Sequence, residues 1–342
     1  MKRNPARIGL IGCIGRVGAR LASRATLLAL AAFVLSPAPA AAQGAGDFPN
    51  RQVTIVVTNA AGGPSDIVAR KLASFMAGRW GQPVVIENRV GANGLVGTQA
   101  VVRAKPDGYT LLLGVPSLST FRILTKNPPV DTERDLVAIS QILEGPYLLT
   151  VHSSMPVNTM QEFIAYAKAR PGKLNYAGIA GGQILAAELL LKRAGIELVR
   201  IPYGGAAPSL AALGNNEVHL GTNTVSTVQP MIASGKLKPI MVTSRRRLPS
   251  LPNVPTPAES GLGDLNVAFW FGLNGPAGMP VAIQEKIAAE VAAWVKLPET
   301  VDELTRGGYL PVGSTPRQFQ EVVSGEIRLW AEVARYAKIE PE

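Results

Sequence analysis

The chain has 342 residues, of which 47% are hydrophobic and 17% are charged, with 35 glycines, 27 prolines and one cysteine. This composition is too apolar for a disordered chain and too poor in cysteine for a disulfide scaffold, and the length suits two domains of ordinary size. The formal charge of +10 suggests nucleic-acid binding, but six of the basic residues lie within residues 1–42, which contain no acid. The remaining 300 residues carry 28 basic and 24 acidic side chains, so no nucleic-acid partner is expected.

Residues 1–42 contain, in order, the three segments that are typical of an export signal. A basic segment precedes an apolar run of 11 residues, Ala25–Leu35, and three small residues follow at Ala40–Ala42. A membrane-spanning helix needs about 20 apolar residues, so an uncleaved anchor is the less favoured alternative. We therefore expect a signal peptide over residues 1–42, cleavage near Ala42 and a mature protein in the periplasm.

The rest of the chain alternates short apolar runs with amphipathic stretches, which predicts an α/β fold with mainly parallel sheets. The pattern predicts strands over residues 52–57, 83–87, 109–113, 147–151, 174–177, 197–202, 218–223 and 239–244. It predicts helices over residues 64–81, 95–104, 159–169, 184–193, 208–213, 281–295 and 316–337. Residues 245–263 are rich in proline and glycine, so we expect a connection there.

Three glycine-rich turns join a predicted strand to a predicted helix, at residues 60–66, 177–183 and 203–208. Ligands bind α/β sheets beyond the carboxyl ends of strands, where unpaired N–H groups at helix N-termini favour anions. The chemistry of the first turn fits a carboxylate site and an internally satisfied helix cap equally well, and its candidate residues are Ala61, Gly62, Gly63, Ser65 and Asp66.

The other glycine-rich segments are weaker candidates when taken alone. The turn at residues 177–183 is more typical of a plain connection, and the phenol of Tyr203 is somewhat more typical of a core side chain than of a ligand contact. The loop at residues 91–97 lacks the Lys-Ser/Thr ending of a P-loop, and we interpret it as a tight turn that packs a helix against the sheet.

Catalytic motifs are scarce in this sequence. His152 and His219 are its only histidines, neither has a second histidine at metal-ligand spacing, and no G-x-S-x-G elbow occurs. The only cysteine, Cys13, lies in the expected export signal. We expect no catalytic residue, no metal site and no cofactor, while an exported hydrolase that uses Ser65 and Asp66 with a histidine stays open as the alternative.

The order of several segments resembles the extracytoplasmic solute-binding receptors of tripartite tricarboxylate transporters, often called Bug proteins. Each segment is weak alone, but together they cover nearly the whole mature chain, at residues 48–57, 61–70, 81–89, 105–112, 169–177, 201–208, 270–273 and 275–278. The resemblance implies a two-lobed, type II-like periplasmic-binding-protein fold, with two mixed, mainly parallel sheets flanked by helices, a hinge and an interlobe cleft. Lobe 1 would comprise residues 43–147 and 268–342, and lobe 2 residues 148–267.

The resemblance also implies a function. The protein would capture a small organic carboxylate in the cleft, catalyse nothing, and deliver its ligand as a monomer to membrane permease subunits. A periplasmic ligand sensor for a signalling system is the alternative among binding proteins. In the family, the first glycine loop and the Tyr-x-Gly loop grip the ligand carboxylate from opposite lobes, which here assigns binding to residues 61–66 and to Tyr203, Gly204, Gly205, Ala206 and Ala207.

Three departures from the family pattern concern the ligand. Thr58-Asn59 replaces a proline and an aromatic residue, the loop that begins at Gly178 is shorter and less polar, and Asn223 replaces an aspartate. We expect a pocket that is less polar and less acidic than usual, with an uncharged or apolar ligand body beyond the carboxylate. Its second-lobe residues would include Gly178, Gly181, Gln183 and Asn223.

Overall fold

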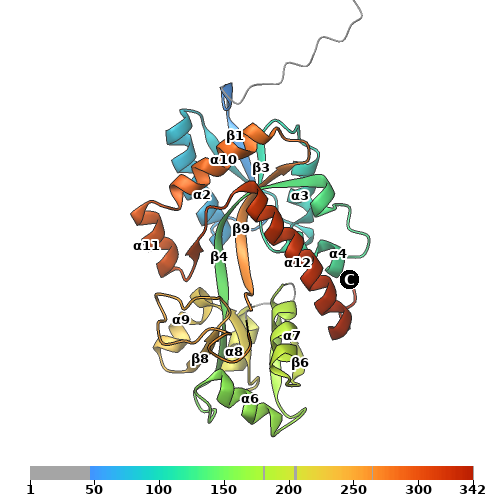
Figure 1. The fold of residues 1–342 in the computed structure, drawn as a ribbon, viewed down its shortest axis with the longest axis vertical. Helices are drawn as coiled ribbons and strands as arrows, with labels where there is room; N and C mark the ends of the chain where they lie inside the picture. The colour runs from blue at the N-terminus through green and yellow to red at the C-terminus, as the bar shows by residue number, and fades with distance from the viewer. Residues whose placement is uncertain (1–46, 180–181, 204–205, 264, 342) are drawn as a thin grey trace, which may run out of the picture. The chain divides into compact units, whose positions relative to one another are not determined.

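The computed structural model describes residues 47–179, 182–203, 206–263 and 265–341 (Figure 1). The expected signal peptide lies outside the described residues, and so do three predicted site residues, Gly181, Gly204 and Gly205. Within the described part of the chain, every helix is too short or too polar to cross a membrane.

Parallel strands begin the main sheet. Strand β1 (Val53–Val57) pairs in parallel with β2 (Val84–Asn88) on one side and with β3 (Thr110–Gly114) on the other. Val53, Ile55 and Val57 are fully buried, as expected for a β-branched run that is covered on both faces. Helix α2 (Pro64–Trp80) follows β1, α3 (Leu95–Val102) follows β2 and α4 (Ser117–Leu124) follows β3, so each of these strands ends in a turn that begins a helix.

The longest strand, β4 (Leu136–His152), extends well beyond the strand predicted at residues 147–151. Its first part pairs antiparallel with β9 (Ala268–Pro276), and its last part pairs antiparallel with β7 (Gly221–Thr224) and β8 (Leu237–Val242). Figure 1 shows β4 and β9 running side by side. The prediction missed the first part because Glu144, Gly145 and Pro146 interrupt the apolar pattern, while pairing with β9 satisfies the backbone there.

The strands on both sides of β4 complete the sheet pattern. Strand β9 also pairs antiparallel with β3, and the short β10 (Leu310–Pro311) pairs antiparallel with β4. Strands β5 (Asn175–Ile179) and β6 (Val199–Tyr203) form a separate parallel pair. The α/β class is therefore confirmed, with parallel pairing among β1, β2 and β3 and between β5 and β6, and antiparallel pairing wherever β4 or β9 takes part.

Four helices lie between β4 and β9 in the chain. They are α6 (Met160–Lys168), α7 (Gly182–Ala194), α8 (Ala206–Gly214) and α9 (Val225–Ala233). Helices α6 and α7 share a core with Leu149 of β4, whereas α8 and α9 pack in a second core with Leu148 of the same strand. Residues 245–263 form turns without a helix or strand, as predicted.

The C-terminal helices are α10 (Val281–Trp294), α11 (Pro298–Arg306) and α12 (Pro316–Ala337). Helix α12 packs against β4 and contributes to two cores. Its Phe319 and Val323 lie with Trp270 of β9, whereas Trp330 and Val333 lie with the core of α6 and α7. Two short helices, η2 (Ala92–Gly94) and α5 (Thr132–Asp135), complete the described elements.

Candidate functional site: a cleft at helix N-termini

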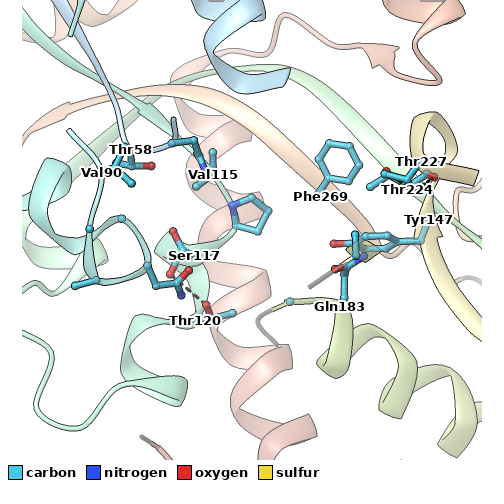
Figure 2. A pocket seen from close by; sticks show the side chains of 18 residues that line it. Thr58, Val90, Val115, Ser117, Thr120, Tyr147, Gln183, Thr224, Thr227 and Phe269 are labelled. Atoms are coloured by element: carbon cyan, nitrogen blue, oxygen red, sulfur yellow. Dashed lines mark hydrogen bonds between the residues drawn. The ribbon is translucent and has the colours of Figure 1, made fainter. Parts of the chain in front are cut away.

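A cavity of about 620 Å³ lies where strands end and helices begin (Figure 2). A second cavity, of about 450 Å³, shares Asn59, Val115, Thr224, Thr227 and Phe269 with the first, so we treat the two as one cleft. The lining residues of the first cavity are Thr58, Asn59, Val90, Gly91, Ala92, Asn93, Gly94, Val115, Pro116, Ser117, Thr120, Tyr147, Gly182, Gln183, Ala206, Thr224, Thr227 and Phe269. The second adds Ala60, Gly63, Pro64, Ser65, Ser226, Phe271 and Tyr309.

Among the described residues, six α-helices begin at this cleft. The residues that line the cleft at their N-termini are Pro64 of α2, Gly94 before α3, Ser117 of α4, Gly182 of α7, Ala206 of α8 and Thr224 before α9. No side chain caps the first turn of α2, α3, α4 or α9. Asp131, Thr159 and Thr315 cap helices whose N-termini do not line the cleft, although α10 and α11, which also begin elsewhere, lack a side-chain cap too. At α4, the N–H groups of Leu118 and Ser119 already donate to the carbonyls of Val115 and Pro116. The partial positive charge of helix N-termini nevertheless makes the cleft suitable for an anion.

In the first glycine loop, Asp66 is a structural residue. Its carboxylate accepts hydrogen bonds from Gly62 N at 2.9 Å, Arg70 Nε at 2.8 Å and Asn88 Nδ2 at 2.9 Å. The side chain is buried and does not line the cleft. The hydrogen bond from Arg70, with help from Gly62 and Asn88, lowers the pKa of Asp66 to about 2. Asp66 therefore holds the loop in place through Gly62, Arg70 and Asn88, although no side chain caps the first turn of α2.

The glycines of this loop have different roles. The left-handed conformation falls on Gly62, with φ of +80°, whereas Gly63 has φ of −75° and precedes α2 in an extended conformation. Gly62 N is occupied by Asp66, so it does not present its N–H to the cleft. Gly63 and Ser65 line the cleft, while Ala61 is exposed outside its lining.

Two predicted residues of the later glycine turns line the cleft. Gln183 lies in the first turn of α7, where its Nε2 donates to the carbonyl of Thr222 at 3.2 Å, and Ala206 begins α8. Ala207, the next residue of α8, is exposed and is not part of the lining.

The other described candidates lie elsewhere. Gly178 and Tyr203 line a different cavity, of about 690 Å³, together with Arg200 and residues near the C-terminus. Asn223 is only 3% exposed, and its Nδ2 donates to Thr150 Oγ1 at 3.1 Å across the β4–β7 pair. Asn223 therefore forms a hydrogen bond inside the sheet and does not line the cleft.

Thr58, Ser117 and the turn at residues 91–94 also line the cleft, although no sequence pattern predicts them as ligand contacts. Thr58 is 5% exposed, and its Oγ1 is buried without a hydrogen-bond partner among the described residues. A Cβ built on Gly94 would lie 3.3 Å from both Thr58 Oγ1 and Ser117 Oγ, so the two hydroxyls flank this glycine. The loop at residues 91–97 was predicted to be a tight turn that packs a helix against the sheet. This holds for Gly97, where a Cβ would lie 2.8 Å from the carbonyl of Arg89. The start of the loop, at residues 91–94, lines the cleft instead.

The described lining contains four aromatic residues, Tyr147, Phe269, Phe271 and Tyr309, and none of them was predicted to contact the ligand. Tyr147 is the β4 residue that lines the cleft; its burial raises the pKa of the hydroxyl far above 10, so it remains a donor. Phe269 of β9 lies beside it, with a ring-centroid distance of 5.8 Å. The loop at residues 91–94 could have been identified because it joins a predicted strand to a predicted helix. No nearby sequence pattern identifies Tyr147 or Phe269 as lining residues.

Neither histidine belongs to the cleft. His152 Nδ1 lies 2.7 Å from Ser154 Oγ, and His219 Nδ1 lies 2.7 Å from Asn175 Oδ1. No group of three or more His, Cys, Asp or Glu side chains within the described ranges could hold a metal ion.

Comparisons with known proteins agree with this arrangement. The profile of the tripartite tricarboxylate transporter family receptor matches residues 68–338. Protein BugT of Bordetella pertussis is 32% identical over 313 residues, which cover 90% of this chain and 96% of BugT. The structure of R. palustris Rpa4515 with adipate has a TM-score of 0.72 and 34% identity, and it covers 86% of this chain and 100% of that one. MatC from Rhodopseudomonas palustris with bound malate has a TM-score of 0.67 and 31% identity, and it covers 84% of this chain and 99% of that one.

These similarities confirm the fold class and the resemblance seen in the sequence. The family consists of solute-binding receptors, so the exported-hydrolase alternative is not supported. This chain belongs to the receptor family of the tripartite tricarboxylate transporters.

Proposed function

We propose that this protein is a periplasmic receptor that captures a small organic carboxylate in the cleft and delivers it to a tripartite tricarboxylate-type transporter. The observation that carries the proposal is the convergence of six α-helix N-termini on one cleft, four of them without a side-chain cap. Their N–H groups can bind a carboxylate without a cationic side chain. Similar proteins with adipate and with malate support this ligand chemistry.

We propose that the cleft lies between two lobes, residues 43–147 with 268–342 and residues 148–267. The change of pairing partners along β4 supports this division: Pro146 is the last residue paired with β9, and Tyr147 is the first paired with β7. Strand β9 begins at Ala268, close to the second proposed boundary. Bending of β4 and β9 at these positions would let the two walls of the cleft close on a ligand.

The ligand that the purified protein retains tests the proposal most directly. Native mass spectrometry followed by denaturing release is expected to identify one small carboxylic acid per chain, and calorimetry with that acid is expected to give one-to-one binding. Release of a ligand without a carboxyl group, together with no heat from any small carboxylate, would contradict the proposal.

A pair of glycine variants tests whether binding takes place in this cleft. Gly94→Ala adds a Cβ at 3.3 Å from the two hydroxyls that flank Gly94, at φ of +94°. Gly172→Ala adds a Cβ at a similarly left-handed φ of +68°, with nothing within 4 Å of it. Both variants carry backbone strain, but only Gly94→Ala is expected to lose affinity, by tenfold or more. Equal affinities in the two variants would place the ligand elsewhere.

We further propose export with cleavage before Gln43, and permease subunits as partners of a monomeric receptor. N-terminal sequencing of periplasmic material is expected to begin at Gln43, and a sequence that begins at Met1 would contradict cleavage. Deletion of the gene is expected to abolish uptake of the identified acid. Intact uptake with a lost transcriptional response would favour the sensor instead.

A further inference from the structure

An apolar groove between α2 and α11 continues from the cleft. It has a volume of about 200 Å³, and it shares Pro64, Ser226 and Tyr309 with the second cavity of the cleft. This groove, which we call the side groove, therefore starts where α2 and α9 begin, beside the cleft in which the proposed function places the ligand.

The interior of the side groove is apolar and belongs to the core of the protein. Val68 of α2, Trp294 of α10 and Leu304 of α11 line it, each is at most 5% exposed, and all three belong to one hydrophobic cluster. Figure 1 shows the three helices next to one another. Because core packing already holds these side chains in place, a ligand group would enter the groove without ordering them.

The charged side chains of the side groove lie at its rim. Lys71 of α2 and Glu303 of α11 are the charged residues of its described lining, each side chain is 46% exposed, and they form an ion pair with each other. Ile67 lies one turn before Lys71 on α2 and is 45% exposed, so it belongs to the same rim. A ligand group in the groove would therefore meet apolar side chains inside and water at the edge.

The end of the side groove that joins the cleft is polar. Ser65, Thr224, Ser226 and Thr227 line the cleft there, at the N-termini of α2 and α9, and neither helix has a side-chain cap. Hydroxyl groups and helix N-termini can bind one carboxylate or two. A ligand whose charged part binds at this place would hold an apolar arm next to the entrance of the groove.

The volume of the side groove limits the size of such an arm. An apolar cavity of about 150 Å³ in another protein is large enough for benzene, so a groove of about 200 Å³ has room for a phenyl ring or a short alkyl chain. Each methylene group that moves from water to an apolar site strengthens binding about fourfold. An arm that fills the groove is therefore expected to strengthen binding about tenfold or more, after the cost of ordering the arm.

We propose that the side groove is a ligand subsite, an inference that rests on the proposed function, and that the receptor takes small carboxylates that carry an alkyl or phenyl arm. The charged part of the ligand binds in the cleft, and the arm lies against Val68, Trp294 and Leu304. Tyr309 lines both the cleft and the groove, so the arm passes its ring. Monocarboxylates and dicarboxylates can both carry such an arm, because the groove receives the part of the ligand that has no charge.

Calorimetry at fixed pH and salt with two matched pairs of acids tests the subsite. The pairs are acetate with hexanoate and succinate with 2-benzylsuccinate, which differ in the arm but not in the number of carboxylates. In each pair the acid with the arm is expected to bind at least tenfold more tightly. Equal affinities within both pairs would overturn the subsite and leave the proposed function intact. No binding of any of these acids, together with no carboxylic acid released from the purified protein, would overturn the proposed function itself.

Two variants of exposed residues test whether the arm lies in the side groove. Ile67 lines the groove, whereas Val301 of α11 is 36% exposed and lines neither the groove nor the cleft. Ile67→Gln replaces part of the apolar rim by an amide, so hexanoate and 2-benzylsuccinate are expected to bind at least fivefold more weakly, while acetate and succinate change less than twofold. Val301→Gln is expected to leave all four affinities unchanged. Equal effects of the two variants on the acids with an arm, with both proteins folded, would overturn the subsite.

Photolabelling provides a test that does not depend on affinity. A hexanoate analogue that carries a diazirine near the end of its chain is expected to label residues 64–71 or 294–304, the segments of α2, α10 and α11 that line the side groove. Excess hexanoate is expected to prevent this labelling. Labelling only of cleft residues outside the groove, such as Phe269 or residues 90–94, would overturn the placement of the arm.

Discussion

Replacement of Asp66 by asparagine separates a structural from a ligand-binding role for the first glycine loop. The carboxylate is buried at 1% exposure and holds Gly62, Arg70 and Asn88 together. Asp66→Asn keeps the shape but removes the negative charge that these donors stabilise. We therefore expect a less stable protein whose carboxylate affinity is nearly unchanged once it is folded.

The size of the effect follows from the pKa of Asp66, which falls from 3.8 to about 2 in the folded protein. Such a decrease stabilises the folded state by about 2 kcal/mol at neutral pH. Because the pKa is lowered by folding, this contribution is complete above pH 4 and disappears as the pH falls towards 2. At pH 3 about half of it remains. The stability difference between the wild-type protein and Asp66→Asn is expected to shrink by the same proportion.

Urea unfolding followed by tryptophan fluorescence at pH 7, 4 and 3 measures this difference, and calorimetry at pH 7 measures ligand affinity. Glu321→Gln is a matched control because Arg317 and Glu321 form an i,i+4 pair like that of Asp66 and Arg70, but both side chains are exposed. An exposed pair of this kind contributes about 0.3–0.5 kcal/mol. A stability loss in Asp66→Asn that does not vary with pH would refute the electrostatic reasoning. A tenfold loss of affinity with normal stability would show that Asp66 contacts the ligand.

Three further predictions concern other residues. Gly62→Ala, at φ of +80°, should lower the free energy of unfolding by about 1 kcal/mol, whereas Gly63→Ala, at φ of −75°, should cost less than half as much in the same urea experiment. Burial raises the pKa of Glu326 to about 7, although Trp270 Nε1 donates to it at 2.8 Å. Glu326→Gln should therefore stabilise the protein at pH 8 by about 1–3 kcal/mol and have little effect near pH 4. A variant that melts at the same temperature as the wild-type protein at both pH values would argue against this. Tyr203 lies outside the cleft lining, so Tyr203→Phe should change carboxylate affinity less than twofold by calorimetry, and a tenfold loss would restore the role that the family resemblance implies.

Local patterns in the sequence determined most of the helices and strands and the receptor family. The β-branched run at residues 52–57, the glycine break and Pro64 predict the boundaries of β1 and α2, because strand burial, chain reversal and helix initiation depend on residues that are close in sequence. The same reasoning identified the glycine turns as the places where helices begin, and four of the predicted site residues in them, Gly63, Ser65, Gln183 and Ala206, line the cleft.

The composition of the cleft depends on contacts between residues that are distant in sequence. Strand β4 continues through Glu144, Gly145 and Pro146 because β9, which follows more than a hundred residues later, pairs with it there. The direction of the Asp66 side chain depends on its hydrogen bond from Asn88. The position of Phe269 in the cleft lining depends on the strand pairing that brings it opposite Gly145. No local pattern encodes these distances. Long-range contacts therefore decided that the glycine loop is held by its own carboxylate, while uncharged side chains and uncapped helix N-termini line the cleft.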